Sequence, residues 1–244
     1  MVPLDIISDP ICPWCLIGKT RLEAAIARVG HNPFTPHWRM FRLNPEMPGE
    51  GMDRQAYLEA KFGGREGAAR VYGRIADIAA EDGLDVDLGA IRRTPQTLDA
   101  HRLIRWAAQD GREEAVVDAL FDRYFRRGED ISDRAVLSDV AIGAGMDGDV
   151  VGRLLDSDAE RASLVEEERA AREMGVTGVP CYVIQGRYVV QGAQDVDTWT
   201  RIIEEIAEAL AKRGAAAEAD ETPSERPSET PSETPSETPG DPSG

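Results

Sequence analysis

The chain has 244 residues, of which 41% are hydrophobic, and its formal net charge at pH 7 is -17. A chain of this length can bury a substantial core, and it contains no apolar run long enough to span a bilayer. The negative charge argues against a protein that binds nucleic acid by neutralising phosphates. We therefore expect neither nucleic acid nor a membrane among its partners.

The first predicted element is a strand over residues 2–8, rich in Leu and Ile as in strands that are buried on both faces. No basic leader or small-residue cleavage site precedes it, so we expect a cytoplasmic protein. A helical pattern begins at Pro13, and Gly30 is placed to end that helix. A second strand is predicted over residues 34–42. The chain thus opens as strand, helix, strand.

The middle of the chain predicts helices only. The apolar spacing of Val71, Ile75 and Ile78 marks one helix, and Gly83 is placed to end it. Further helices are predicted over residues 97–109, 113–127, 137–144 and 158–173. The last of them is charged on most faces, so we expect it to be exposed. We find no strand pattern between Met47 and Met174.

Strand patterns return near the end of the chain. Residues 181–184 and 187–191 predict a hairpin with its turn at Gln185 and Gly186. Residues 195–210 form the clearest helical pattern in the sequence, with large apolar residues at helical spacing. These elements resemble the opening of the chain in kind, although about 130 predicted helical residues separate the two parts.

The predicted domain organisation follows from this order. The fold class is α/β, with one domain built from residues 1–45 and 176–213 and an all-helical domain inserted at residues 46–175. Residues 214–244 repeat Pro-Ser-Glu-Thr and contain no apolar residue larger than alanine. Such a composition cannot bury a core, so we expect a disordered acidic tail.

The most informative motif is SDPICPWC at residues 8–15, where the first strand meets the first helix. Cys12 lies at the start of the helix, where free backbone N–H groups and the helix dipole favour a thiolate. Cys15 follows one helical turn later, and Pro13 suits the first turn because its missing N–H is not needed there. Two thiols at this spacing can form a disulfide and reopen it, which is redox chemistry.

The sequence resembles the DsbA-type branch of the thioredoxin superfamily, and within it the FrnE-like proteins. Four segments carry the resemblance: SDPICPWC at residues 8–15, FRLNP at 41–45, TLDAHRL at 97–103, and GVTGVP at 175–180 with the later GAQ at 192–194. The resemblance implies a thioredoxin-like fold with a helical insertion and thiol–disulfide exchange. Its substrates would be protein, peptide or small-molecule thiols and disulfides.

The resemblance also assigns residues to roles. It implies that Cys12 is the exposed nucleophile, that Cys15 resolves the mixed disulfide, and that the Val179–Pro180 bond is cis. Substrate would bind against Pro13, Trp14, Val179 and Pro180. No cofactor is expected, although glutathione is a candidate co-substrate. We assign no metal ligands, because structural zinc needs four Cys or His ligands and the sequence has no second close pair.

Two other function classes stay open. Glutathione-dependent isomerases and transferases, such as hydroxychromene-carboxylate isomerase and the kappa-class transferases, share this fold and its insertion. They activate glutathione with a serine in place of the first thiol and need no second cysteine, so the intact pair of Cys12 and Cys15 favours redox turnover. A chaperone or binding module with an incidental dithiol is the third class.

A few single residues also have two interpretations each. Cys181 follows Pro180 and would either approach Cys12 as a third thiol or be a small buried strand residue, and we favour the second. Asp9 would either relay a proton to Cys15 or cap the turn. His101 would line the active-site cleft or lie on a helix face. Trp38 would belong to a substrate groove or, as is more frequent in such strands, to the core.

Overall fold

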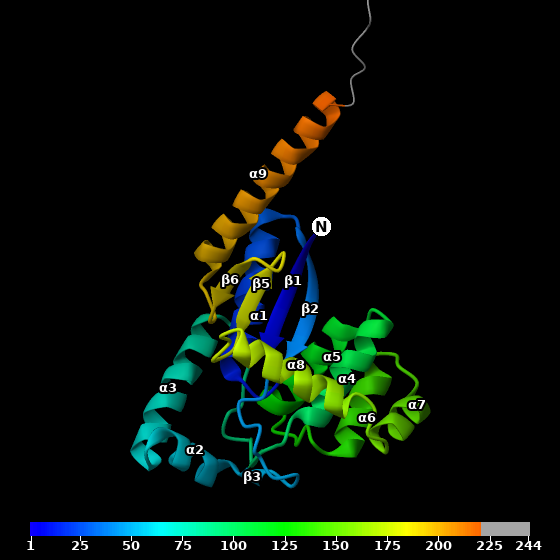
Figure 1. Ribbon diagram of the computed structural model, residues 1–244. Coiled ribbons are helices and arrows are strands. Elements are labelled where there is room, and N and C mark those ends of the chain that lie inside the picture. The colour runs from blue at the N-terminus through cyan, green and yellow to red at the C-terminus, as the bar shows by residue number, and fades with distance from the viewer. Residues whose placement is uncertain (221–244) are drawn as a thin grey trace, which may run out of the picture. The chain divides into compact units, whose positions relative to one another are not determined.

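Four strands form the central sheet: β1 (Val2–Ser8), β2 (Phe34–Met40), β5 (Cys181–Ile184) and β6 (Tyr188–Gln191). In the computed structural model their order is β2-β1-β5-β6 (Figure 1), with β2 parallel to β1 and the other neighbours antiparallel. The expected fold class, α/β with a long helical region between two parts of one sheet, is confirmed. The second strand ends at Met40 rather than at Arg42.

Helix α1 (Pro13–Val29) and the first part of α9 (Val196–Asp220) share the core on one face of this sheet. Pro13 stands in the first turn of α1, and the helix ends at Gly30, whose φ of 82° is one that glycine adopts without strain. Trp199 of α9 is fully buried and stacks edge-on against Phe34 and Tyr182. The strand side chains under α1 therefore lie in a closely packed apolar layer.

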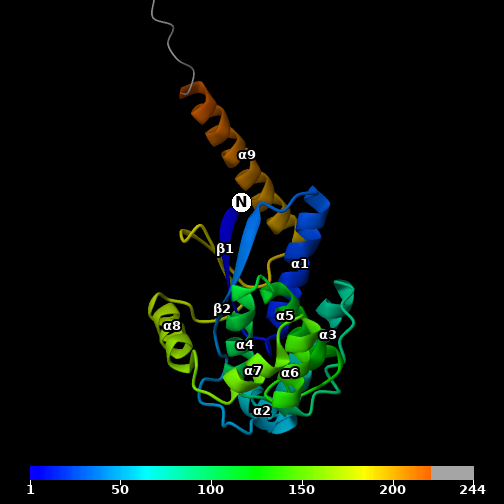
Figure 2. The same ribbon diagram turned by 90° about the vertical axis from the view of Figure 1, so that its right-hand side faces the viewer.

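Helix α8 (Arg161–Glu173) lies on the opposite side of the sheet from α1, as Figure 2 shows. We expected this segment to be an exposed helix, and that expectation is wrong for Glu168, which is only 2% exposed. Its carboxylate accepts hydrogen bonds from the Arg42 backbone and guanidinium and from Arg172. A buried charge is tolerated when it is paired and hydrogen-bonded in this way.

The region between β2 and β5 is mainly helical. Its elements are β3 (Met52–Asp53), α2 (Arg54–Phe62), α3 (Arg65–Glu81), β4 (Arg93–Thr94), α4 (Leu98–Gln109), α5 (Glu113–Phe121), the π-helix η1 (Asp122–Arg126), α6 (Arg134–Gly143) and α7 (Gly148–Leu155). The expectation of no strand in this region is wrong for β3 and β4, which pair antiparallel. Strands of two residues are too short to produce an alternating pattern in the sequence.

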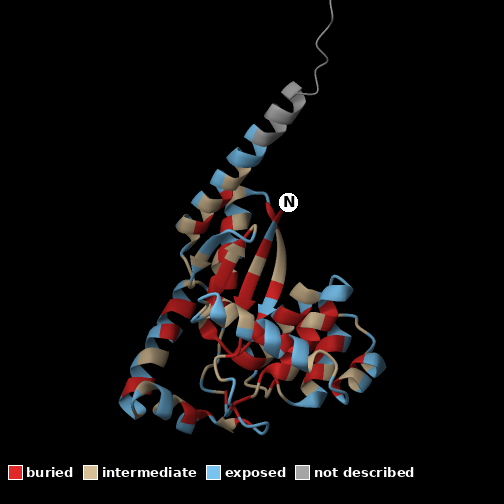
Figure 3. Cartoon of the chain, viewed as in Figure 1, coloured by how far each residue is buried: buried red, intermediate tan, exposed pale blue. Residues whose placement is uncertain are grey.

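Met1–Ile206 form one compact unit. Its largest core cluster contains residues of β1, α1, α4, α5 and α6 together, and Figure 3 shows buried residues in the sheet and in the helices alike. The structure describes the chain through Asp220, with side chains through Lys212. Helix α9 continues past Arg213 to Asp220, and the rest of the predicted acidic tail lies outside the described residues. No described helix has the length and apolar character needed to cross a bilayer.

Candidate functional site

Cys12 is the N-cap residue of α1, directly after the turn that leaves β1. Its backbone N–H donates to the Asp9 carbonyl oxygen over 2.9 Å, and its own carbonyl accepts the first N–H groups of the helix. The first turn of α1 contains no acidic side chain. Cys12 therefore lies at the positive end of the helix dipole, in a first turn without a competing acidic side chain.

The exposure of Cys12 differs from the expectation. The residue is 3% exposed, so the implied role of an openly exposed nucleophile needs correction. Its thiol donates to the Val179 carbonyl oxygen over 3.6 Å, and Val179 precedes Pro180 in a cis peptide bond. The segment before β5 therefore helps to cover Cys12 and leaves little of the residue open to a substrate.

Cys15 is 1% exposed and lies one turn further along α1. Burial, and then the neighbouring Cys12 sulfur, raise the pKa of the Cys15 thiol well above its ordinary value. The Ser8 hydroxyl and the Asp9 backbone hydrogen-bond to the sulfur and act in the opposite direction. Both cysteines are free thiols. Cys15 is therefore a protonated thiol that can ionise only with help from its surroundings.

The other predicted site residues lie around this pair. Pro13 and Pro180 are buried, whereas Trp14 and Val179 are partly exposed. The Pro180 ring packs closely against α1 because Gly18 has no side chain there. A Cβ on Gly18 would lie only 3.1 Å from that ring. The structure thus brings the N-terminus of α1 together with the segment before β5, although more than 160 residues separate Cys12 from Val179 in the chain.

Asp9 is fully buried and holds the dithiol turn in place. Its carboxylate accepts hydrogen bonds from the backbone N–H groups of Ile11 and Leu43, over 3.3 and 2.7 Å. Burial raises the pKa of Asp9 to about 7, while these hydrogen bonds oppose the shift. The interpretation of Asp9 as a turn cap is therefore confirmed, and the cap also joins the turn to the segment after β2.

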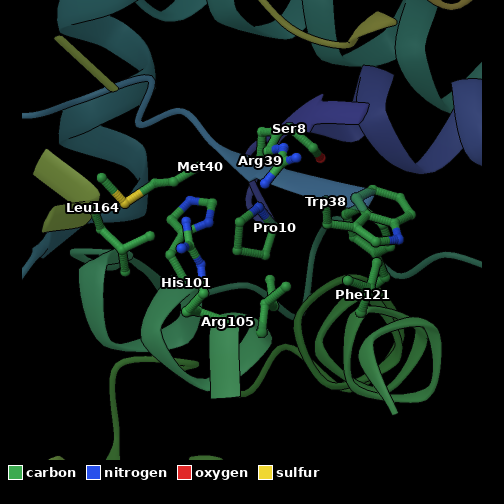
Figure 4. A pocket seen from close by; sticks show the side chains of 11 residues that line it. Ser8, Pro10, Trp38, Arg39, Met40, His101, Arg105, Phe121 and Leu164 are labelled. Atoms are coloured by element: carbon green, nitrogen blue, oxygen red, sulfur yellow. The ribbon is translucent and has the colours of Figure 1, made fainter. Parts of the chain in front are cut away.

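His101 lies on α4 and is 4% exposed, with its Nε2 atom 3.9 Å from the Asp9 carboxylate. Burial lowers the pKa of His101 to about 3, so the ring is neutral. It lines a narrow pocket together with Pro10 (Figure 4), and neither Cys12 nor Cys15 lines that pocket. The volume of about 10 Å³ leaves room for one water molecule at most. The pocket is too small for a substrate.

Cys181 lies on the other side of the sheet from the dithiol. It is 1% exposed and packs with Ile7 and Phe41, whereas Cys12 and Cys15 belong to the core cluster under α1. Successive side chains of a strand point to opposite faces, so Tyr182 points toward the dithiol and Cys181 away from it. The interpretation of Cys181 as a small buried strand residue is confirmed. Trp38 and Phe41 are likewise core residues, 7% and 2% exposed.

A groove of about 480 Å³ lies between α2 and α3 and includes Arg54 and Tyr72 among its lining residues. Arg54 is 6% exposed, and its guanidinium lies within 6 Å of three tyrosine ring centres. It donates to Thr94 and to the Tyr72 hydroxyl, and it makes no ion pair with any carboxylate in the described part of the chain. An unpaired buried cation is costly, so this groove suits an anionic group.

Tyr72 is a second polar residue of this groove. Burial raises the pKa of its phenol, whereas the Arg54 charge lowers it. No sequence pattern singled out Arg54, Tyr72 or Glu168 as functional or structural polar residues. A single charged residue on an amphipathic helix gives no sign of burial in the sequence, because burial depends on the packing of distant segments.

One group of carboxylates in the described region is close enough to share a metal ion. Its members are Glu23, Glu114 and Asp118. The Lys19 ammonium, which is 6% exposed, forms ion pairs with all three of them. The position that a cation would take beside these carboxylates is thus filled by a lysine side chain, and the group has no connection with the dithiol.

Comparisons with known proteins identify similar sequences and folds. Residues 3–204 match the family described as DSBA-like thioredoxin domain. A probable DsbA oxidoreductase from Streptomyces coelicolor is 31% identical, with a TM-score of 0.75 over 84% of this chain and 89% of that chain. The cytosolic disulfide reductase DsbM from Pseudomonas aeruginosa, whose structure was solved with GSH, is 20% identical, with a TM-score of 0.61 over 84% and 99%. A 2-hydroxychromene-2-carboxylate isomerase is 16% identical, with a TM-score of 0.63 over 88% and 98%.

Proposed function

Because the chain belongs to the DsbA-like family of thiol oxidoreductases, we propose that Cys12 and Cys15 exchange disulfides with thiol substrates. One observation carries the proposal: two free thiols lie one turn apart at the N-terminus of α1, and the first contacts the Val179 carbonyl beside Pro180. In this proposal Cys12 is the nucleophile, Cys15 is the resolving thiol and the Val179 carbonyl is a backbone acceptor beside them.

The proposed reaction has two steps. The Cys12 thiolate attacks a disulfide R–S–S–R, a bond forms between Cys12 and one sulfur, and the other sulfur leaves as a thiolate that takes up a proton. The Cys15 sulfur then loses its proton and attacks Cys12, so that the Cys12–Cys15 disulfide forms and the second R–S⁻ leaves and is protonated. The substrate disulfide is reduced and the protein dithiol is oxidised by the same two electrons.

We propose a small acidic thiol, glutathione or a relative of similar size, as the co-substrate that reduces the Cys12–Cys15 disulfide. The 3% exposure of Cys12 favours a slender partner over a folded protein surface. The groove at Arg54 and Tyr72 supports the proposal, because its unpaired guanidinium suits a carboxylate. An extended peptide that passes Trp14 and Val179 would meet the same limits of access.

We also propose that the protein acts in the cytoplasm, where thiols are kept reduced, as does the cytosolic Pseudomonas reductase to which its fold is similar. The isomerase alternative draws support from the shared fold and from the groove that suits an anion. Such chemistry would not consume Cys15, so it predicts that a Cys15→Ser variant keeps full turnover. Disulfide exchange predicts that this variant stops after the first step.

The test is to trap the intermediate. Cys15→Ser in the full chain should accumulate a covalent mixed disulfide at Cys12 when it is mixed with oxidised glutathione or with disulfide-bonded insulin, as seen by intact-mass spectrometry. Cys181→Ser is the matched control, because it also removes one buried thiol, and it should accumulate no such adduct. Unimpaired turnover by Cys15→Ser, with no adduct at Cys12, would contradict the proposed function.

A further inference from the structure

The Tyr182 hydroxyl is a buried polar group that the mechanism described so far does not use. Tyr182 is fully buried in β5, on the face under α1, and its ring stacks edge-on against Trp199 with centres 4.8 Å apart. The hydroxyl oxygen is buried and has no hydrogen-bond partner among the residues that the structure describes. Buried hydroxyl groups nearly always have a partner, so this one calls for an explanation.

Packing alone does not require the hydroxyl. A phenylalanine at position 182 would fill the same layer and stack on Trp199 in the same way. The hydroxyl itself destabilises the fold, because a polar group that leaves water without a partner loses its hydration. It also restricts α1, because a Cβ at Gly18 would collide with the Tyr182 oxygen.

The location of the hydroxyl suggests what it serves. Gly18 lies three residues after Cys15, and residues at this spacing share one face of a helix. The Tyr182 hydroxyl packs against Gly18 and therefore lies on the same face of α1 as the resolving thiol. Burial raises the pKa of Tyr182 well above its ordinary value, and the charges of Cys15 and then Cys12 raise it further. The phenol thus keeps its proton and can act beside the sulfur only as a donor or a neutral acceptor.

Cys15 has few other groups to stabilise its charge. The Ser8 hydroxyl and the Asp9 backbone hydrogen-bond to its sulfur, while burial and Cys12 disfavour the thiolate. No positively charged side chain is among the causes that act on it. A third neutral donor at this position would stabilise a buried thiolate more strongly than it would in water, because the surroundings have a low dielectric constant.

We propose that the Tyr182 hydroxyl donates a hydrogen bond to the Cys15 sulfur while that sulfur carries negative charge during disulfide exchange. The inference rests on the proposed function and adds a residue to its second step. When Cys15 attacks Cys12, the hydroxyl stabilises the thiolate before the new S–S bond forms. When a thiol reopens the Cys12–Cys15 disulfide, Cys15 leaves as the thiolate, and the same hydrogen bond stabilises the leaving group. The first attack by Cys12 does not involve it.

The test separates the two steps in one measurement. Ellman's reagent releases one coloured thiolate when Cys12 attacks it and a second when Cys15 resolves the mixed disulfide, so stopped-flow absorbance shows two phases. All variants carry Cys181→Ala, so that only the dithiol reacts. Tyr182→Phe should slow the second phase about tenfold or more and leave the first phase unchanged, because it removes a hydrogen bond to a charged group.

The pH dependence supplies a readout that loss of packing would not change. The second phase becomes faster as Cys15 ionises, and in Tyr182→Phe this rise should move to higher pH by about one unit, which corresponds to the tenfold effect. The midpoint of thermal unfolding of Tyr182→Phe should equal or exceed that of the protein with Tyr182 intact, because the hydroxyl that is removed has no hydrogen-bond partner among the described residues. Tyr124→Phe is the matched control: Tyr124 is also fully buried, but its hydroxyl pairs with the Arg93 carbonyl.

Two results would overturn the inference. One is an unchanged second phase in Tyr182→Phe; the other is an equal slowing in Tyr124→Phe, which would assign the effect to packing. Failure of the proposed function has a different signature. In that case the Cys181→Ala protein with Tyr182 intact would release one thiolate and show no second phase, or would release none.

Discussion

Cys15 and Cys181 are equally buried, each 1% exposed, yet they lie in different surroundings on the two faces of the sheet. Cys15, under α1, has the Cys12 sulfur, the Ser8 hydroxyl and a backbone N–H around it. Cys181, on the α8 side, packs with Ile7 and Phe41, and burial is the one cause that raises its pKa. Equal burial therefore leaves the two thiols with different groups to stabilise an anion, and under the proposed function this difference decides which of them reacts.

The two faces also differ in what holds them together. Under α1, apolar contacts dominate, with Trp199 stacked against Tyr182 and Phe34. On the α8 side, the Glu168 carboxylate is paired with Arg42 and Arg172, and the Arg172 guanidinium lies 3.9 Å from the centre of the Phe41 ring. We therefore expect changes under α1 to act on the chemistry and changes under α8 to act on stability.

Cys12→Ser should have the largest effect. The variant lacks the sulfur that attacks the disulfide, so glutathione-dependent reduction of insulin should fall to the uncatalysed rate. Urea denaturation should show a free energy of unfolding close to that of the wild type, since serine and cysteine side chains are similar in size. If Cys12→Ser kept a catalytic rate, the chemistry would take place elsewhere, and the face under α1 could no longer be distinguished by its chemical role.

Glu168→Ala should have the next largest effect, and on stability. It leaves the buried guanidinium of Arg42 without its carboxylate, which costs about 3–5 kcal/mol in the free energy of unfolding. Urea denaturation measures the loss. Glu166→Ala is the control on the same helix, because its partner Arg169 is exposed and such surface pairs contribute little to stability. Glu168→Ala protein that is still folded should exchange disulfides at the wild-type rate. An exchange rate that fell together with the free energy of unfolding would contradict the division of roles between the two faces of the sheet.

Asp9→Asn should change how stability depends on pH, because Asp9 joins the dithiol turn to the segment after β2. The pKa of Asp9 is about 7 in the folded state and about 3.9 in the unfolded state. Between these pH values the Asp9 carboxyl is therefore protonated in the folded protein and ionised in the unfolded chain. Asp9 therefore contributes stability below about pH 4 that is lost as the pH rises to 7.

The measurement is the difference in unfolding free energy between Asp9→Asn and the wild type, taken by urea denaturation at several pH values. Relative to Asp9→Asn, the wild type should lose a few kcal/mol of unfolding free energy as the pH rises from 4 to 7. Above pH 7 the difference should stay constant. His101 and Glu113, which also have shifted pKa values, are present in both proteins and cancel in the difference. A difference independent of pH would mean that Asp9 is ionised throughout this range.

Cys181→Ala should have the smallest effect. It opens a small cavity beside Ile7 and Phe41 and should lower the free energy of unfolding by about 1 kcal/mol. The disulfide-exchange rate should be unchanged. In the wild type at pH 6, iodoacetamide should label Cys12 well before Cys181, as peptide mass spectrometry can show. Equal labelling rates would mean that the helix N-terminus gives Cys12 no advantage over a buried thiol in apolar surroundings.

Local patterns predicted the elements that build the dithiol end of the molecule. The strand over residues 2–8, the N-terminus of α1 at Pro13 and the hairpin turn at Gln185 and Gly186 lie where the sequence placed them. Each depends on neighbouring residues: a run of apolar side chains, a proline in a first turn, or a glycine that adopts a positive φ without strain, here Gly186 at 65°. Helices α2 and α7 were not recognised individually, because they lie within a long helical region without strong boundaries.

By itself, the sequence determined that two thiols lie one turn apart at the start of a helix, because the helical repeat fixes that spacing within four residues. Only the tertiary structure decided how far Cys12 is covered, on which face of the sheet Cys181 lies, and which polar groups surround Cys15. Those properties depend on contacts between segments more than 100 residues apart, such as Cys12 with Val179 and Arg42 with Glu168. Burial and the pairing of charges are set by packing, and a local pattern of residues contains no record of which distant segment will supply the partner.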